Sequence, residues 1–145
     1  AETLLLLVAG KNPGELLGNL EFEVRNLGYL NEPEFVQAFQ LSDVFASPSI
    51  EDSGPSTVNM SVLTGTPVVA FDVGVSRDLI KNGESGFIVE SKDTHAFSKA
   101  LVEILTLEEV AYRILEKNTR AIALEKCSKE KQVSSVLKYF NDFLD

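Results

Sequence analysis

The sequence is poor in the residues that cross-link a small domain or hold a metal in it. Among its 145 residues there is one cysteine, one histidine and no tryptophan. Cys127 has no partner for an intrachain disulfide, and one histidine with one cysteine gives no ligand set for a structural zinc. The chain is therefore predicted to work in a reducing, cytoplasmic setting without a bound metal.

Long apolar runs are missing as well. The longest, from Leu4 to Ala9 in LLLLVAG, is too short to span a membrane and has no basic leader of the kind that precedes a secretion signal. We expect no transmembrane segment. The run instead has the composition of a short strand that is buried on both faces.

Positive charge is scarce. The chain has 13 Lys and Arg against 22 Asp and Glu, which gives a net charge of −9. Proteins that bind a nucleic-acid backbone do so largely through clustered Lys and Arg, so nucleic acid is excluded as an expected partner. An anionic ligand would need a local site, such as the N-terminus of a helix.

What the sequence does contain is the composition of an ordinary globular domain. Hydrophobic residues make up 44% of the chain and charged residues 24%. These fractions are typical of a packed domain and not of a disordered chain, and the length fits one domain.

Short apolar segments alternate with helical patterns along the chain. Segments bounded by glycine, proline or polar turns predict strands at 4–9, 22–28, 44–49, 67–71 and 86–90. Helical patterns lie between them, and three helices close the chain. The alternation predicts an α/β fold: a Rossmann-like, open and mostly parallel sheet of about five strands, with helices on both faces and three C-terminal helices.

Several residues predict where these helices begin and what they cover. Asn31 with Glu34, and Thr106 with Glu109, have the spacing of a capping box, and Asp93 is suited to be an N-cap. The last helix carries one continuous apolar stripe, which has to pack on this domain or a neighbouring one. The stripe consists of Val133, Val136, Leu137, Phe140, Phe143 and Leu144.

One loop is richer in chemistry than the others. In an open parallel sheet, ligands bind beyond the carboxyl ends of the strands, and there the segment IEDSGPST places carboxylates, small hydroxyls and a glycine before a predicted helix. Free amides from Ser53 to Thr57, together with the helix dipole, would attract an anion such as a phosphate. The same residues also fit an ordinary helix start without a ligand, with Asp52 or Ser53 as N-cap and Pro55 as first-turn proline. Spacing alone leaves both interpretations open.

The order of several segments resembles one known family, the GT-B-fold glycosyltransferases of family 4. The segments are LGYLNEPEFVQAFQLSDVFASPS, IEDSGPSTVN, GTPVVAFDVG, DLIKNGESGFIVESKDTHAFSKAL and the helical ALEKCSKEKQ region. The likeness covers about 120 residues and is to the C-terminal, donor-binding half of the family. It implies a retaining transfer of sugar from a nucleoside-diphosphate sugar to a hydroxyl of a carbohydrate or glycolipid acceptor, in polysaccharide or glycolipid biosynthesis.

The resemblance also implies roles for single residues. Asp52, with Glu51 beside it, matches the first of two donor-binding acids, and a carboxylate accepts hydrogen bonds from two vicinal hydroxyls. The sugar and diphosphate would further contact Ser53, Gly54, Pro55, Ser56 and Thr57. The nucleotide base would lie beside Gly28, Tyr29 and Leu30. Tyr29 equally fits a surface aromatic that follows a strand. The family implies no metal and no cofactor, because helix dipoles and side-chain cations stabilise the departing diphosphate.

At the position of the second acid, which binds ribose in the family, the sequence has Met60, next to Asn59. Met60 lies about 200° around the helix from Val58, and so points away from the expected core stripe of Val58 and Val62. Three explanations stay open: a divergent site in which Asn59 or a water substitutes, a domain that no longer binds donor, or an introduced change. With one anchor missing, we expect this chain alone to bind a nucleoside diphosphate only in the millimolar range.

Relative to the family, the acceptor-binding N-terminal domain is absent, and so is a strand and helix with a basic pair. We therefore expect residues 1–145 to be a fragment, the donor-binding domain, without transfer activity of its own. The full-length protein is expected in the cytoplasm, with peripheral membrane contact left open. Two alternatives are a stand-alone binding domain whose site has decayed and half of a nucleotide-sugar epimerase.

The lone histidine and cysteine are not predicted site residues. His95 lies opposite the stripe that contains Phe97, so we expect it to be solvated. Cys127 lies in the charged stretch EKCSKEK without a histidine nearby in the sequence, which argues against a nucleophile.

Overall fold

The computed structural model describes residues 4–11, 20–54, 56–74 and 76–144. They form two compact units, Ala1–Ala38 and Phe39–Asp145. Both units are built from parallel strands and helices, so the predicted α/β class is confirmed.

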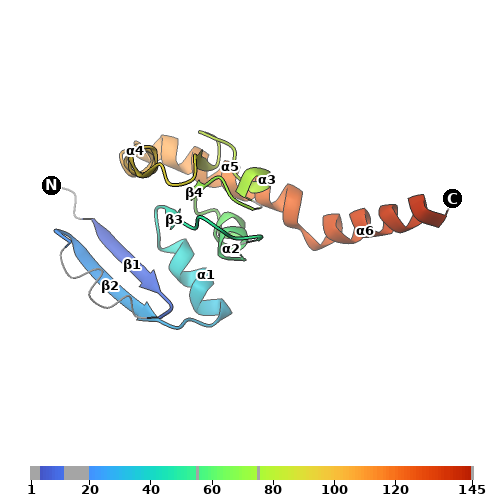
Figure 1. Ribbon diagram of the computed structural model, residues 1–145, viewed down its shortest axis with the longest axis horizontal. Coiled ribbons are helices and arrows are strands. Elements are labelled where there is room, and N and C mark those ends of the chain that lie inside the picture. Colours follow the sequence, from blue (N-terminus) through green and yellow to red (C-terminus); the bar gives the residue numbers. More distant parts are fainter. Residues whose placement is uncertain (1–3, 12–19, 55, 75, 145) are drawn as a thin grey trace. The chain divides into compact units, whose positions relative to one another are not determined.

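The first unit contains two strands and most of one helix. Strand β1 (Leu5–Ala9) pairs in parallel with β2 (Glu23–Gly28), and the two arrows lie side by side in Figure 1. Helix α1 (Glu32–Gln40) follows, and its start is the predicted capping box. The Asn31 amide donates to Glu34 Oε2 at 2.8 Å, and the Glu34 amide donates to Asn31 Oδ1 at 3.0 Å.

The expectation that β1 is buried on both faces is wrong. Both of its ends are exposed and its middle is only half-buried; Leu5 keeps 41% of its surface accessible. Among the described residues β1 has one hydrogen-bonded neighbour, β2, which is itself no better covered. An apolar strand becomes fully buried only where strands flank both of its edges and helices cover both of its faces.

The second unit holds a three-stranded parallel sheet. The strands β3 (Phe45–Ser47), β4 (Val68–Phe71) and β5 (Gly86–Val89) lie in the order β3-β4-β5. Between them come α2 (Ser56–Thr64) and the short α3 (Ser76–Leu79). The three predicted closing helices follow as α4 (Thr94–Leu105), α5 (Glu109–Cys127) and α6 (Lys129–Leu144).

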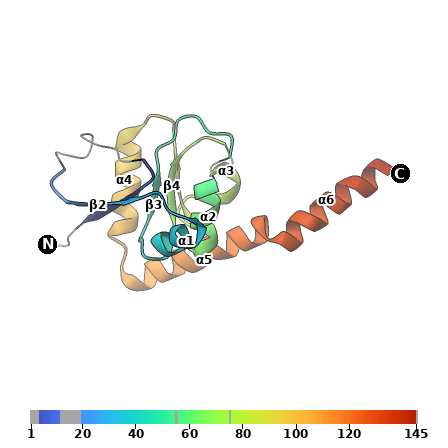
Figure 2. The ribbon, with the colours of Figure 1, turned by 90° about the horizontal axis from the view of Figure 1, so that it is seen from below.

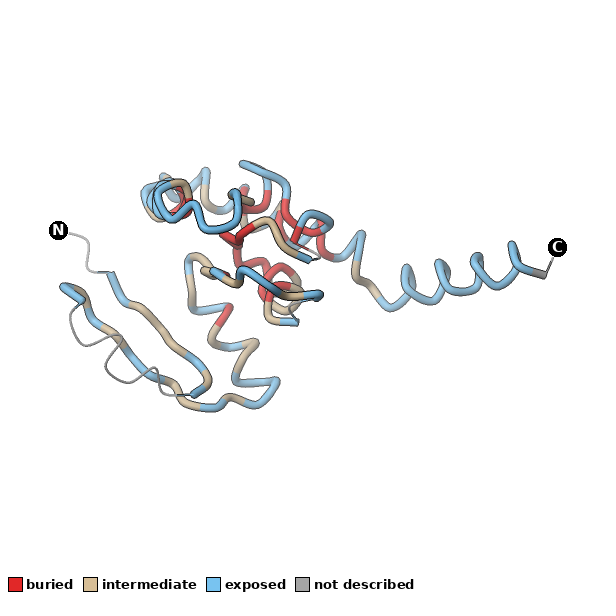
Figure 3. Tube along the Cα trace, viewed as in Figure 1, coloured by how far each residue is buried: buried red, intermediate tan, exposed pale blue. Residues whose placement is uncertain are grey.

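Helices cover both faces of this sheet, as predicted. Side chains of β4 alternate between two apolar clusters: Val68 and Ala70 pack with α2, α3 and the end of α5, whereas Val69 and Phe71 pack with α4 and the start of α5. Figure 2 shows α4 on one side of the strands and α2 and α3 on the other. In Figure 3 the buried residues concentrate around this central strand.

The expectation of a single sheet of about five strands needs correction. The described residues contain five strands, but they hydrogen-bond in two sheets, one of two strands and one of three. Apolar runs mark which segments are strands, whereas the partner of each strand is decided by tertiary packing over long sequence separations. The sequence therefore predicted the strands but not their grouping.

Two helix-start predictions have opposite outcomes. Asp93 caps α4 as predicted, because its Oδ1 accepts the Ala96 amide at 2.9 Å. The capping box of Thr106 with Glu109 is wrong. Thr106 is instead the C-cap of α4 and donates its hydroxyl to the Val102 carbonyl at 2.8 Å, so α5 begins after Glu108 without a side-chain cap.

Helix α6 forms as predicted, but the structure shows no cover for its apolar stripe. Those of the stripe residues whose side chains are described are all exposed, from Val136 at 53% to Phe143 at 81%. Residues 129–143 of the helix are all exposed (Figure 3). Within the described residues, no helix combines the length and apolar character needed to cross a membrane.

Candidate functional site

The loop after β3 leaves the core at the carboxyl end of the sheet. Ser47, the last residue of β3, is buried, whereas Glu51, Ser53 and Gly54 are exposed. Asp52 is half-buried between them. The polar loop therefore starts at a buried residue but presents its own groups to solvent, as a ligand-binding loop must.

The Asp52 carboxylate folds back onto its own loop. Its Oδ1 accepts the Gly54 amide at 2.9 Å, which is a two-residue side-chain turn. This amide, one of those expected to be free for an anion, is therefore occupied by the protein. The turn also fixes the orientation of the carboxylate with a neutral donor.

Helix α2 presents its N-terminus directly after this loop. It begins at Ser56; the neighbouring predicted site residue, Pro55, lies outside the described residues. Ser56 is exposed and Thr57 half-buried, and amides in the first turn of a helix have no partner within the helix. The helix dipole adds a partial positive charge there, so this end can attract an anion.

A buried stripe of side chains anchors helix α2 to the core. Val58 and Val62 are fully buried, which confirms the predicted core stripe. The buried Ser61 hydroxyl donates to the Thr66 carbonyl at 3.1 Å, and Arg120 Nη1 donates to the Leu63 carbonyl at 3.3 Å near the C-terminus. The helix is thus rigidly placed relative to β4.

Asn59 and Met60 lie on the same helix and are both half-buried. Neither is part of the two buried clusters that flank β4. Met60 is therefore partly accessible on the helix that follows the loop, and its assignment to the ribose position stays a prediction.

A second loop packs directly against the first. It follows β4, and at Gly74 the backbone φ is +54°. A Cβ built on Gly74 would lie 2.5 Å from the carbonyl oxygen of Asp52 and 3.2 Å from the carbonyl carbon of Ser53. The sequence offered only the glycine itself as a signal; this contact between loops at the ends of two neighbouring strands was missed.

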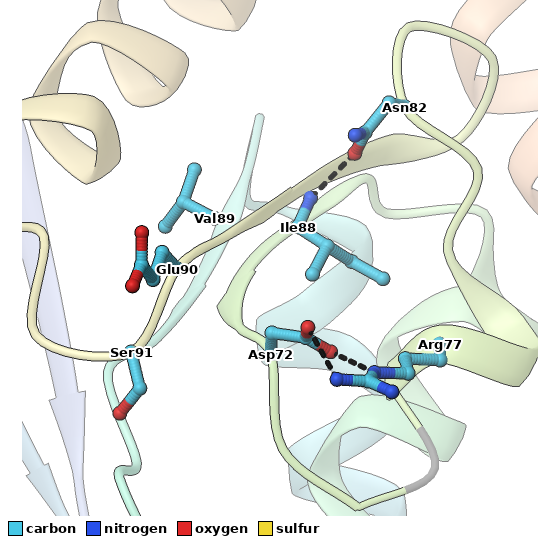
Figure 4. Close-up of a pocket in the computed structure, with 7 residues that line it drawn as sticks. All are labelled: Asp72, Arg77, Asn82, Ile88, Val89, Glu90 and Ser91. Atoms are coloured by element: carbon cyan, nitrogen blue, oxygen red, sulfur yellow. Dashed lines mark hydrogen bonds and ion pairs between the residues drawn. The ribbon is translucent and has the colours of Figure 1, made fainter.

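The loop after β4 also forms one wall of an open cavity of about 600 Å³ (Figure 4). In it the Arg77 guanidinium faces the Asp72 carboxylate, with Nη2 donating to Oδ2 at 2.7 Å and Nε to Oδ1. The hydrogen bond from Arg77 lowers the pKa of Asp72. The cavity lies at the ends of β4 and β5 and is lined by Asp72, Arg77, Asn82, Ile88, Val89, Glu90 and Ser91.

The predicted base-binding residues belong to the first unit. Gly28 ends β2 with φ at +67°; its amide donates to Asn26 Oδ1 at 2.9 Å, and its carbonyl accepts the Gly10 amide at 2.6 Å. Tyr29 is 82% exposed and Leu30 is half-buried. An exposed aromatic ring beside a glycine is available for stacking, but it equally fits the surface aromatic that the sequence allowed.

The histidine and cysteine are not part of these loops. His95 is exposed, as predicted, and Cys127 ends α5, where burial raises the pKa of its thiol. A raised pKa keeps the thiol protonated and unreactive at neutral pH. Among the described residues, no group of three or more His, Cys, Asp or Glu side chains is placed to hold a metal.

Comparison with known proteins identifies the family. Residues 1–107 match the family described as glycosyl transferases group 1. The chain belongs to this family. A phosphatidyl-myo-inositol mannosyltransferase of Mycobacterium leprae is 30% identical to this chain over 122 residues, which are 81% of this chain and 33% of the relative. The chain thus spans about a third of that relative's length.

Solved structures share the fold of this chain. A sucrose-phosphate synthase from Thermosynechococcus elongatus matches 98% of this chain and 38% of its own, with a TM-score of 0.79 and 21% identity. The Anabaena protein HepE, solved with UDP-glucose, matches 92% of this chain and 40% of its own, with a TM-score of 0.72 and 18% identity. At these identities the likeness shows the fold of this chain, and it supports the predicted α/β class.

Proposed function

We propose that this chain is the donor-binding domain of a glycosyltransferase that moves a sugar from a nucleoside-diphosphate sugar to a hydroxyl group of a carbohydrate or glycolipid. The observation that carries the proposal is the polar loop at the carboxyl end of β3, which ends at the N-terminus of α2. Family membership supports transfer over the epimerase and over a stand-alone binding domain.

In this proposal Asp52 binds the sugar. Its Oδ1 already accepts the Gly54 amide, and among the described residues Oδ2 has no hydrogen-bond partner. A carboxylate held in this way offers a preorientated acceptor to a sugar hydroxyl, and hydrogen bonds to an ionised carboxylate contribute about 1.5–3 kcal/mol. Glu51 is exposed beside it and serves as the secondary acceptor.

The diphosphate binds at the start of α2. The amides of Ser56 and Thr57 and the hydroxyls of Ser53 and Thr57 are the groups available on the described part of this loop. An N-terminal helix dipole stabilises an anion by about 0.3–1 kcal/mol per charge near solvent, and by more where water is excluded. The departing nucleoside diphosphate gains negative charge in the transition state, so donors fixed in place lower the barrier.

The remaining parts of the proposal concern the base, the acceptor and the cellular setting. Gly28, Tyr29 and Leu30 contact the base, through main-chain groups and the face of the tyrosine ring. A separate acceptor domain completes the active site, and for this reason residues 1–145 alone do not catalyse transfer. The protein works in the cytoplasm without a metal or cofactor. Peripheral attachment to a membrane is compatible with a glycolipid acceptor.

Titration calorimetry of the full-length protein with UDP-glucose, and with other nucleoside-diphosphate sugars, tests the proposal. The variant Asp52→Asn keeps the size of the side chain but removes its charge, and it should weaken donor binding by about 10-fold to 100-fold. Glu103→Gln, which neutralises an exposed acid on α4, is the matched control and should bind as the wild type does. Equal affinities of all three proteins would overturn the role of Asp52, and no binding of any nucleotide sugar would overturn the function.

A substitution at Met60 is expected to strengthen donor binding instead of weakening it. If donor binding is weak because an acceptor is missing at this position, Met60→Glu should tighten it by about tenfold or more. Met60→Gln, which has a similar length but no charge, separates hydrogen bonding from the effect of charge. A wild type that binds in the micromolar range and gains nothing from Met60→Glu would show that another group already replaces the acid.

A further inference from the structure

The polar loop around residues 51–54 is called the donor loop below. The loop after β4 approaches it more closely than any side chain at the contact would allow. With φ at +54° and only hydrogen at its Cα, Gly74 lies against the backbone of Asp52 and Ser53. We infer that Gly74 is a positioning residue for the donor loop. This role rests on the proposed function, since it acts through Asp52 and touches no substrate itself.

Steric exclusion at this contact is severe because backbone meets backbone. A Cβ at Gly74 would lie 2.5 Å from the Asp52 carbonyl oxygen, closer than real Cβ atoms come to an oxygen, and 3.3 Å from the Ser53 carbonyl oxygen. A flexible side chain could rotate away, whereas a carbonyl moves only with its peptide unit. Any larger residue at position 74 therefore displaces one of the two loops.

The loop after β4 is the better anchored of the two. The Asp72 amide donates to the Val89 carbonyl of β5 at 2.9 Å, and the Asp72 carboxylate binds Arg77 with both oxygens. Ser76, at the start of α3, is fully buried. For the donor loop, in contrast, the described residues 51–54 show one side-chain hydrogen bond, within the loop itself. A clash at Gly74 will therefore move Asp52 and Ser53.

Displacement of the Asp52 peptide changes what the proposed site presents. The carbonyl that would clash belongs to the residue whose carboxylate is the proposed sugar acceptor, and the turn from Asp52 to Gly54 moves with it. Shifts of about 1 Å in a substrate-positioning group reduce catalysis by up to about 100-fold. The effect of a Gly74 variant should therefore fall on donor binding and turnover more than on stability.

The test compares Gly74→Ala with Gly83→Ala in the full-length protein. Gly83 also has a positive φ, +76°, but a Cβ there meets nothing within 4 Å. Both variants introduce similar backbone strain, and only Gly74→Ala introduces the clash. A third variant, Gly74→Asn, has a side chain that tolerates positive φ but still carries a Cβ. Each protein is measured by hydrogen–deuterium exchange over residues 49–63, by thermal unfolding, and by titration with UDP-glucose and the other donors.

We expect Gly74→Ala and Gly74→Asn to speed exchange in residues 49–63 and to weaken donor binding at least about tenfold, while Gly83→Ala changes neither. Exchange in this segment needs no donor, so it tests the contact even if no nucleotide sugar binds to the wild type. If the Gly74 variants exchange faster but the wild type binds no donor, the contact between the loops is supported and the proposed function is refuted. Unchanged exchange in both Gly74 variants would refute the positioning role, and so would full recovery of binding in Gly74→Asn.

Discussion

Strands β1 and β4 have nearly the same apolar character but very different surroundings. Every residue of β4 is buried, whereas no residue of β1 is. Strand β4 pairs on both edges, with β3 and β5, and lies between two helical layers; β1 pairs with β2 alone among the described residues. The difference teaches that an apolar run specifies a strand, while burial depends on what the rest of the chain places around it.

The residues proposed to bind the donor are divided between the same two regions. The proposed donor loop and the loop that contacts it leave from the ends of β3 and β4, in the three-stranded sheet. The predicted base-binding residues follow β2, in the unit whose described residues include none that is buried. A rigid scaffold positions ligand-binding loops precisely enough for chemistry, so the proposed sugar-binding loop has a firmer structural basis than the proposed base-binding residues.

The largest expected difference between the two strands comes from one matched substitution. Val69→Ala removes two methyl groups from a fully buried position and should lower the free energy of unfolding by about 2–3 kcal/mol. Val8→Ala removes the same groups from a half-buried position and should cost less than about 1 kcal/mol. Urea denaturation measures both. Equal losses would show that β1 is as well covered as β4.

A comparison of helix caps extends the test to both units. Asp93→Ala removes the cap of α4, which covers β4, and Asn31→Ala removes that of α1. Each should destabilise its own helix by about 1 kcal/mol. Hydrogen exchange should then show local opening in α1 with little change in global unfolding, but a global loss for Asp93→Ala. A global loss from both variants would mean that the two units unfold together.

Tyr112 of α5 contacts the segment before β3, and its phenol group makes the stability of this contact depend on pH. Its hydroxyl donates to the Asp43 carbonyl at 3.0 Å, and burial raises its pKa to about 12. Because the folded pKa lies above the unfolded value, this stabilisation is complete below pH 10 and is lost as the pH rises from 10 towards 12.

Tyr112→Phe should therefore lower the free energy of unfolding at pH 7 by about 1 kcal/mol, the contribution of one hydrogen bond. The variant should also lose part of the fall in stability that the wild type shows above pH 10. Tyr139→Phe is the control, since Tyr139 is 72% exposed on α6. An identical alkaline profile for wild type and Tyr112→Phe would contradict the assignment.

The smallest effect is expected at Ser76, the first residue of α3. Its hydroxyl is fully buried and has no hydrogen-bond partner among the described residues. Removing an unsatisfied buried polar group costs little, so Ser76→Ala should leave the free energy of unfolding unchanged or raise it by up to about 1 kcal/mol. A loss greater than that would reveal a partner for the hydroxyl.

Most local features of the fold could be predicted because they depend on neighbours in the sequence. Asn31 and Glu34 cap each other across one turn, and Val58 and Val62 share one face of α2 because of helical periodicity. The Thr106 prediction failed where two helices compete for one residue. A C-cap of the preceding helix and an N-cap of the next have overlapping signals, and the geometry of the connection decides between them.

The polar loop from Glu51 to Thr57 could be recognised from its composition before a helix, but its internal geometry could not. Whether the Asp52 carboxylate binds the Gly54 amide or stays free depends on the backbone of the turn. The pairing of Asp72 with Arg77 and the approach of Gly74 to Asp52 join residues on different elements. Sequence spacing gives no measure of such distances.

By itself, the sequence determined the order of strands and helices, the parallel α/β class and the position of the polar loop after β3, because periodicity and turn residues act within a few positions of the chain. Tertiary structure alone decided which apolar strand is buried, how the strands group into sheets and which glycine lies against the backbone of the polar loop. These outcomes depend on contacts between segments far apart in sequence, such as Gly74 with Asp52, and such contacts form only when the sheet brings the strand ends together.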